Sequence, residues 1–243
     1  MVVEVCANSL SSVLIAQEAG ANRVELCQNL WCGGTTPSAA TIEWTRQYLT
    51  IDVFVLVRPR SGDFCYTELE FQVMQRDILF CKENGINGIV TGILTPDGAI
   101  DTARMLLLQR LAHPMQVTFH RAFDFVQQPF RALNQLIDMG INRVLSSGFK
   151  SSAIDGQKNI KALLEAAQEQ IAILAGGGLN TDNIRDFVDY TGVQEIHLSG
   201  KHLVQSPFHA PLVQLNNEGI PELDYLETNP DTIKKIVEIL AEK

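Results

Sequence analysis

Short apolar runs rich in Val, Ile and Leu alternate along the chain with longer segments whose apolar residues recur at helical spacing. We interpret the short runs as β-strands, at Val2–Cys6, Arg23–Leu26, Val53–Val57, Gly88–Thr91, Gln116–Phe119, Arg143–Leu145, Ala172–Ala175 and Glu195–Leu198. The longer segments are predicted helices, at Ser11–Ala19, Ser38–Leu49, Glu68–Glu83, Thr102–Leu111, Phe130–Met139, Ile160–Gln168, Asn183–Tyr190 and Thr232–Ala241. Strand starts recur about every 30 residues, which is the length of one βα unit.

Eight βα units in one series predict an α/β fold of the closed (β/α)8, or TIM-type, barrel. The 243 residues of the chain agree with the roughly 250 residues of such a barrel. No linker or change of composition divides the chain, so we expect a single domain over residues 1–243. The one long irregular stretch, residues 200–229, follows the last strand, and we expect it to act as a lid over the C-terminal rim.

The alternation of side chains along each strand predicts a polar barrel interior. The apolar positions should pack outward on the helices, which leaves the other positions pointing inward. The inward side chains are then Glu4, Cys6, Arg23, Glu25, Cys27, Arg58, Gln116, Thr118, His120, Glu195, His197 and Ser199. A barrel that served stability alone would have Val, Ile and Leu there. Polar residues near the C-terminal strand ends therefore indicate a ligand pocket, whereas Glu4 and Arg23, nearer the N-terminal ends, suit an internal salt-bridge network.

Two loops carry candidate catalytic or anion-binding side chains. Arg58 and Arg60 follow the third strand, and their guanidinium groups suit a carboxylate or a phosphate. His120, Arg121 and Asp124 follow the fifth strand, where an imidazole, a guanidinium and a carboxylate suit proton transfer or the orientation of a polar ligand. The alternatives are a surface turn with an Arg–Asp pair and a histidine held by a neighbouring carboxylate.

The loops after the last three strands are candidates for an anion site. Many barrels bind phosphate with backbone N–H groups of the loops after strands seven and eight. The candidate ligands are Ser147, Lys150, Gly177, Gly178, Ser199 and Gly200. The alternative is that the glycines only permit tight turns between strand and helix.

Charge and cysteine content exclude several classes of protein. A formal net charge of −9 argues against a nucleic-acid or anionic-membrane partner, since both favour clustered Lys and Arg. No apolar run approaches the ~18 residues of a membrane span, and the N-terminus does not resemble a secretory signal. The five cysteines form no CxxC pair, so we expect a reduced, cytosolic protein, with a homo-oligomer as the default assembly.

Several motifs, in order along the chain, resemble the CutC family, which is named for copper homeostasis. They are Glu4-Val5-Cys6, residues 21–27 (ANRVELC), residues 33–38 (GGTTPS), residues 58–64 (RPRSGDF), residues 117–124 (VTFHRAFD), residues 143–148 (RVLSSG), Gly176-Gly177-Gly178 and Glu195-Ile196-His197. The resemblance extends from residue 1 to about residue 200 and implies a cytosolic TIM-type barrel linked to copper handling.

The same resemblance implies that Cu(I) binds to Cys6 and Cys27, at the ends of the first two strands. Both side chains are predicted to point inward, adjacent strands lie ~4.8 Å apart, and soft thiolates suit Cu(I). Cys32, in the following loop, is a further candidate ligand. The alternative is that each cysteine is a small core residue.

Two functional hypotheses follow. In the first, the protein binds Cu(I) without catalysis. In the second, it is an enzyme that acts on a small anionic or phosphorylated metabolite, where Arg58 and Arg60 hold the anion, His120 or Glu25 moves a proton, and Asp124 orients a partner. A third, less specific interpretation is a scaffold that self-associates.

Overall fold

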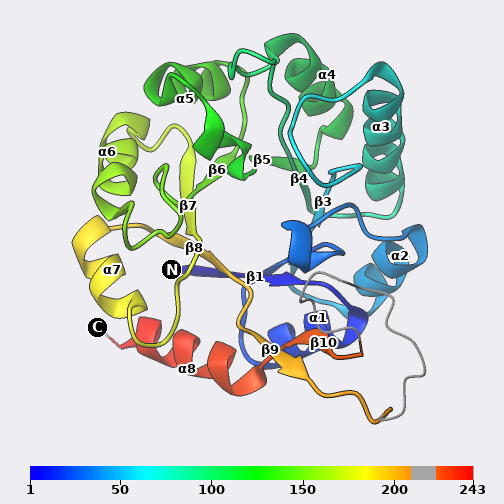
Figure 1. The fold of residues 1–243 in the computed structure, drawn as a ribbon, viewed down its shortest axis with the longest axis vertical. Coiled ribbons are helices and arrows are strands. Elements are labelled where there is room, and N and C mark those ends of the chain that lie inside the picture. Colours follow the sequence, from blue (N-terminus) through cyan, green and yellow to red (C-terminus); the bar gives the residue numbers. More distant parts are fainter. Residues whose placement is uncertain (209–222, 243) are drawn as a thin grey trace.

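The computed structural model describes residues 1–208 and 223–242, and in this part of the chain eight parallel strands close into a barrel (Figure 1). Each strand pairs with the next, and β8 pairs with β1 to close the sheet. The strands are β1 (Val2–Ala7), β2 (Arg23–Leu26), β3 (Asp52–Leu56), β4 (Gly88–Thr91), β5 (Gln116–Phe119), β6 (Arg143–Ser146), β7 (Ala172–Gly176) and β8 (Glu195–Leu198). The predicted (β/α)8 barrel is confirmed.

Helices surround the barrel (Figure 1). They are α1 (Leu10–Glu18), α2 (Ala39–Tyr48), α3 (Glu68–Glu83), α4 (Thr102–Ala112), α5 (Pro129–Asp138), α6 (Gln157–Ala167), α7 (Ile184–Thr191) and α8 (Pro230–Ala241). Local sequence sets several helix starts. Thr67 and Glu70 form a capping box at the start of α3, and the Asn229 side chain accepts a hydrogen bond from the Thr232 N–H at the start of α8.

Two short 3₁₀ helices, which the sequence pattern did not predict, lie in loops that follow β2 and β5. They are η1 (Leu30–Cys32) and η2 (Arg121–Phe125). The His120 side chain accepts a hydrogen bond from the Ala122 N–H and so caps η2. One candidate site residue therefore also shapes its own loop.

The outward-facing strand residues form the main hydrophobic core with the helices. Val3, Val5, Val24 and Leu26 are buried there, as the alternation predicted. The free energy of this burial, roughly 25 cal/mol per Å² of apolar surface, holds the helices against the sheet. The interior of the barrel is thus left to the polar positions of the same strands.

The N-terminal half of the interior contains a paired network of charges. Arg23 donates to both Glu4 and Glu195, and Arg143 Nε lies 2.9 Å from Glu195 Oε2. The two guanidinium groups lie over the Phe54 ring, 4.9 and 5.1 Å from its centroid. The salt-bridge network expected for Glu4 and Arg23 is present, and it extends across the barrel.

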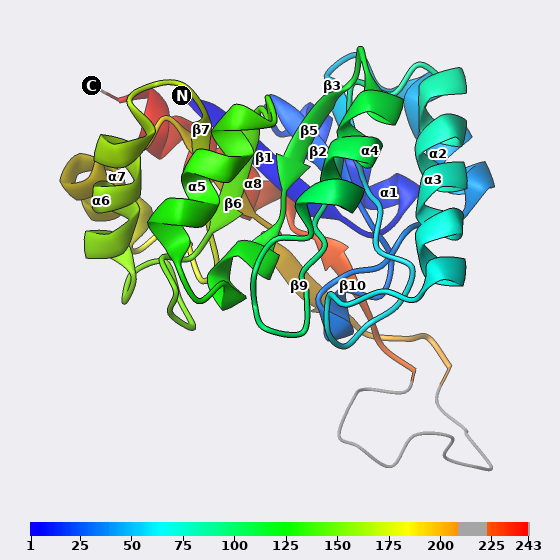
Figure 2. The ribbon, with the colours of Figure 1, turned by 90° about the horizontal axis from the view of Figure 1, so that it is seen from above.

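Residues 200–229 are not irregular throughout, which corrects the sequence-based expectation. β9 (Lys201–Val204) and β10 (Tyr225–Thr228) form an antiparallel ribbon, because their backbone groups pair with each other. Figure 2 shows the ribbon beside α1, where the Thr228 N–H donates to Ser12 Oγ at 3.1 Å. Residues 209–222 of the expected lid lie outside the described residues.

Among the described helices, each is too short or too polar to cross a membrane.

Candidate functional site

A cavity of about 250 Å³ lies at the C-terminal end of the barrel strands. Its lining residues are Cys6, Glu25, Gly33, Leu56, Arg58, Phe64, His120, Arg121, Phe125, Leu145 and His197. They come from the C-terminal parts of the strands and from the loops that follow them. Enzymes with this fold keep their active sites at this end of the barrel. The predicted pocket and much of the predicted polar interior therefore coincide.

Cys6, which lines this cavity, faces Cys27, which is fully buried and is not among the lining residues. Their sulfur atoms lie 3.5 Å apart. Cys6 is in β1, and Cys27 directly follows β2, where its N–H donates to the Ala7 carbonyl. Gly34 packs against this pair with a positive φ of 86°, and a Cβ there would lie 3.6 Å from the Cys27 Cβ and 2.7 Å from Leu56. The glycine thus lets the loop after η1 close over Cys27.

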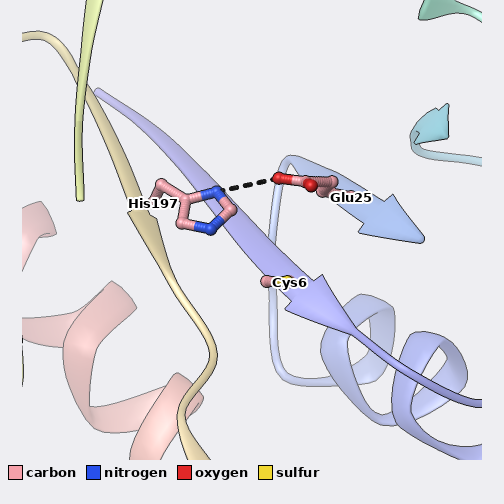
Figure 3. Close-up of side chains that lie close together, drawn as sticks. All are labelled: Cys6, Glu25 and His197. Carbon is pink, nitrogen blue, oxygen red and sulfur yellow. Dashed lines mark ion pairs between the residues drawn. The ribbon is translucent and has the colours of Figure 1, made fainter. Parts of the chain in front are cut away.

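His197, Glu25 and Cys6 form a compact cluster beside the cysteine pair (Figure 3). One ligand-type atom from each of the three lies within 4.8 Å of the other two. His197 Nδ1 lies 2.7 Å from Glu4 Oε1 and 3.4 Å from Glu25 Oε2. The other ring nitrogen of His197 lies on the side of Cys6 in Figure 3. Sequence alternation predicts only that His197 points into the barrel interior, because alternation does not say which inward side chains meet.

The protonation preferences in this cluster differ sharply. Burial raises the pKa of Glu25 to about 7, although the charge of His197 opposes this. Burial would also raise the pKa of Glu4, but the hydrogen bond to His197 and the charge of Arg23 bring it down to about 2. The His197 pKa lies well above its ordinary value: burial lowers it, but Cys6, Glu4 and Glu25 outweigh burial. We infer an imidazolium held between two carboxyl groups.

The thiol of Cys6 resists ionisation in the metal-free protein. Its pKa is raised well above the ordinary value, first by the hydrogen bond with Cys27 and then by burial. The hydrogen bond with His197 acts in the opposite direction and favours the thiolate. A metal that binds here must displace a thiol proton.

His120 lies on another wall of the cavity as a neutral imidazole. Its Nδ1 accepts a hydrogen bond from the Ala122 N–H at 3.2 Å, so its proton is on Nε2. Burial and the charge of Arg58 lower the His120 pKa to about 3. Gly92 makes room for the ring, because a Cβ there would lie 2.7 Å from it. Nε2 is a buried donor with no hydrogen-bond partner among the described residues.

Arg58 is buried and largely committed to its surroundings. Its two terminal nitrogens donate to the backbone carbonyls of Cys32, Gly34 and Gly62 at 2.6–3.0 Å. Only Nε has no partner among the described residues. The guanidinium predicted to hold an anion therefore mainly holds two loops, although Arg58 does line the cavity and keeps one unpaired N–H.

Arg60 is not among the residues that line the cavity. It pairs with Glu70 of α3 and, at 3.0 Å, with Asp63, and its guanidinium lies over the Tyr66 ring. The structure therefore has the Arg–Asp surface turn that was the alternative interpretation of this loop.

Asp124 orients neighbouring groups and has little capacity left for other partners. It accepts hydrogen bonds from Ser146 Oγ, Ser147 Oγ and the Ser147 and Phe149 N–H groups. It also pairs with Arg121, whose Nε lies 2.8 Å from Asp124 Oδ2. Arg121, 40% exposed, lines the cavity together with His120 of the same loop. Its guanidinium belongs to the loop after the fifth strand that the sequence singled out, directly after His120.

The six candidate anion ligands do not line the cavity. Ser147 and Gly177 lie next to Arg121, since a Cβ on Gly177 would be 3.4 Å from the Ser147 Cβ and 3.5 Å from Arg121 Nη1. Gly200 faces α8, where a Cβ would lie 2.4 Å from Ile233. The remaining three are elsewhere on the rim: Lys150 is exposed, Gly178 faces Ser152 and Ser199 is half-buried.

Cys32 is exposed on η1, and its thiol donates to the Asn29 carbonyl at 3.2 Å. It does not belong to the cluster of Cys6, Glu25 and His197. The remaining cysteines, Cys65 and Cys81, lie outside the cavity lining.

Comparisons with known proteins identify the family. The sequence model of the CutC family matches residues 1–202. The chain is 46% identical to a family protein CutC of Vibrio vulnificus over 82% of this chain and 80% of the relative. It is 43% identical to the copper homeostasis protein cutC homolog of Homo sapiens over 82% of this chain and 73% of the relative.

Comparison with solved structures supports the same family. A CutC crystal structure from Streptococcus agalactiae, 37% identical, superimposes with a TM-score of 0.79 over 82% of this chain and 98% of that chain. A phosphoribosylanthranilate isomerase of Pyrococcus furiosus, 13% identical with a TM-score of 0.61 over the full length of both chains, shares the barrel fold alone. The fold, the order of the motifs and these relatives together place the chain in the CutC family, to which it belongs.

Proposed function

We propose that this protein acts in copper homeostasis and binds Cu(I) between the thiolates of Cys6 and Cys27. The observation that carries the proposal is the 3.5 Å separation of the two sulfur atoms beside a cavity. The names of the human and mouse relatives, which refer to copper homeostasis, support the same role.

The chemistry of the surrounding groups suits this cargo. Thiolates are soft ligands that favour Cu(I) over harder ions. Two thiolates and one Cu(I) carry a net negative charge, and the imidazolium of His197 lies beside Cys6 to balance it. In this arrangement His197 stabilises the bound thiolate as a hydrogen-bond donor and cation. Phe54, Leu56 and Val90 enclose Cys27 in an apolar environment that keeps water from the sulfur.

Binding should depend on pH because the thiols must lose their protons. The Cys6 pKa is raised well above its ordinary value, so near neutral pH each binding event releases a proton from Cys6. Affinity for Cu(I) therefore rises with increasing pH, up to the raised thiol pKa.

The test is an anaerobic Cu(I) titration against a competing chelator. The wild type should bind close to one ion per chain tightly, and the variant with Cys6→Ser and Cys27→Ser should lose this site. Cys65→Ser is the matched control, because Cys65 is a half-buried thiol outside the cavity lining. Tight binding that survives in the double variant, or is lost equally in the control, would contradict the assignment.

A further inference from the structure

Three residues that line one cavity each have a buried polar atom without a hydrogen-bond partner among the described residues. The three atoms are Glu25 Oε2, Arg58 Nε and His120 Nε2. Five buried side-chain atoms in all are without a partner among the described residues, so most of them belong to this one cavity. Native proteins rarely leave buried polar groups unpaired, because each costs stability. The contents of the cavity are the natural partners of these three atoms.

One wall of the cavity offers only hydrogen-bond donors and positive charge. His120 offers Nε2–H, because its Nδ1 is already an acceptor for the Ala122 N–H. Arg58 offers Nε–H and is held in place by three carbonyl groups. Both side chains pack on Phe64, with the Arg58 guanidinium 5.2 Å and the His120 ring 4.9 Å from the Phe64 ring centroid. Arg121 adds a half-exposed guanidinium at the mouth. This wall suits the oxygens of an anion.

Glu25 comes from β2, whereas His120 follows β5, and three strand-to-strand steps separate β2 from β5 around the barrel. A second anionic group next to Glu25 would be repelled. A hydroxyl group can both donate and accept a hydrogen bond, so it suits this carboxyl group in either protonation state.

The remaining lining limits the size and character of the ligand. Leu56, Phe64, Phe125 and Leu145 give the cavity apolar walls. Its volume of about 250 Å³ lies below the roughly 300–1,000 Å³ of pockets for drug-sized ligands. A short carbon skeleton with polar groups at both ends fits these limits.

We propose that this cavity binds a small organic hydroxy-anion, with its carboxylate or phosphate at His120, Arg58 and Arg121 and its hydroxyl at Glu25. The proposal goes beyond copper binding, because it assigns a small-molecule ligand to groups that a two-thiolate site does not use. It keeps Arg58 from the predicted anion site, but it places the anion at His120 and Arg121 in place of Arg60 and the glycine loops.

The test uses metal-free protein with chelator present, so that it does not depend on the copper site. Lactate carries both a carboxylate and a hydroxyl group. Propionate lacks the hydroxyl, and propane-1,2-diol lacks the carboxylate charge. Binding is followed by NMR through the His120 ring signals. We expect saturable binding of lactate. The affinity for propionate and for propane-1,2-diol should be about tenfold lower or weaker still, because each lacks one hydrogen-bonded group. Glycerol 3-phosphate, compared with lactate, distinguishes a phosphate ligand from a carboxylate ligand.

Two variants locate the site, with binding of lactate and glycerol 3-phosphate measured by calorimetry. His120→Asn keeps a side-chain oxygen for the Ala122 N–H but removes the Nε2 donor, and we expect about a tenfold loss of affinity. Arg121→Gln removes the positive charge at the cavity mouth and should weaken binding similarly. Because the Arg121 side chain is half-exposed, this change does not put folding at risk. His202→Asn, on β9 outside the cavity lining, is the matched control and should leave binding unchanged.

Three outcomes would overturn the proposal. The first is no saturable binding of lactate or glycerol 3-phosphate, which means that the cavity holds water only. The others are equal affinity for lactate, propionate and the diol, and wild-type affinity in both His120→Asn and Arg121→Gln. The Cu(I) titration is repeated on His120→Asn, where we expect wild-type affinity. A failure of copper binding and a failure of anion binding are thereby separate results.

Discussion

Glu4 and Glu25 are inward-facing carboxyl groups on neighbouring strands, only one interior layer apart, yet their surroundings are opposite. Glu4 accepts hydrogen bonds from Arg23 and His197, and its pKa falls to about 2. Glu25 Oε2 has no hydrogen-bond partner and only the 3.4 Å ion pair with His197, and the pKa of Glu25 rises to about 7. A fully paired charge in a barrel interior indicates structure, whereas a buried polar group left unpaired beside a cavity indicates a site.

The largest effect should come from breaking the paired layer. Arg23→Met keeps much of the side-chain volume but leaves Glu4 and Glu195 without their shared partner. Removing one partner of a buried ion pair costs about 3–5 kcal/mol, and we expect a loss of this size in the free energy of unfolding. Urea denaturation measures it. A loss no larger than that of a surface arginine would show that the layer does not stabilise the barrel.

The two carboxyl groups should give stability opposite dependences on pH. Glu4, with its pKa lowered from 4.5 to about 2, contributes stability that is complete above pH 4.5 and is lost as the pH falls toward 2. Glu25, with its pKa raised from 4.5 to about 7, keeps a proton in the folded protein that the unfolded chain releases. Stability from Glu25 is therefore complete below pH 4.5 and declines as the pH rises to about 7, by about 3 kcal/mol at most.

Glu25→Gln should remove this decline, because an amide does not titrate. Urea denaturation of the metal-free wild type and variant at several pH values between about 4.5 and 8 measures the difference. Parallel curves for the two proteins over this range would mean that Glu25 ionises in the folded protein as it does in the unfolded chain.

A smaller effect is expected where the cavity wall depends on a glycine. Gly92→Ala would place a Cβ 2.7 Å from the His120 ring, so the ring must shift. We expect a loss of about 1–3 kcal/mol in unfolding free energy, as for other overpacked sites. The NMR signals of the His120 ring should move as well. Gly85→Ala, where a Cβ meets nothing within 4 Å but φ is positive, separates backbone strain from crowding. Unchanged His120 signals in Gly92→Ala would contradict the expected contact.

The smallest effect should come from Arg60. Its ion pairs with Asp63 and Glu70 lie at the surface, where such pairs contribute about 0–1 kcal/mol. Arg60→Met should therefore change stability little and leave lactate binding intact, as calorimetry can check. A clear loss of lactate affinity would restore Arg60 to the anion site expected from the sequence.

The sequence predicted the strands and helices well because their patterns are local. All eight strands were predicted to within two residues at each end, as β1 and β3 illustrate. The alternation of side chains also placed Glu4, Cys6 and Glu25 inside correctly. The sequence did not predict the ribbon β9–β10. Its two short strands show no clear alternation, and they pair only with each other. Catalysis, a homo-oligomer and a cytosolic location stay predictions.

The alternation of apolar and polar residues by itself determined the barrel, its polar interior and the inward direction of Cys6 and Cys27, because strand periodicity and βα spacing are properties of neighbouring residues. The tertiary structure decided which inward groups meet. Arg23 reaches Glu195 across 172 residues, and Arg58 turns its terminal nitrogens to loop carbonyls rather than to the cavity. Such pairing depends on the stagger of a closed barrel and on competition among partners, which no local pattern records.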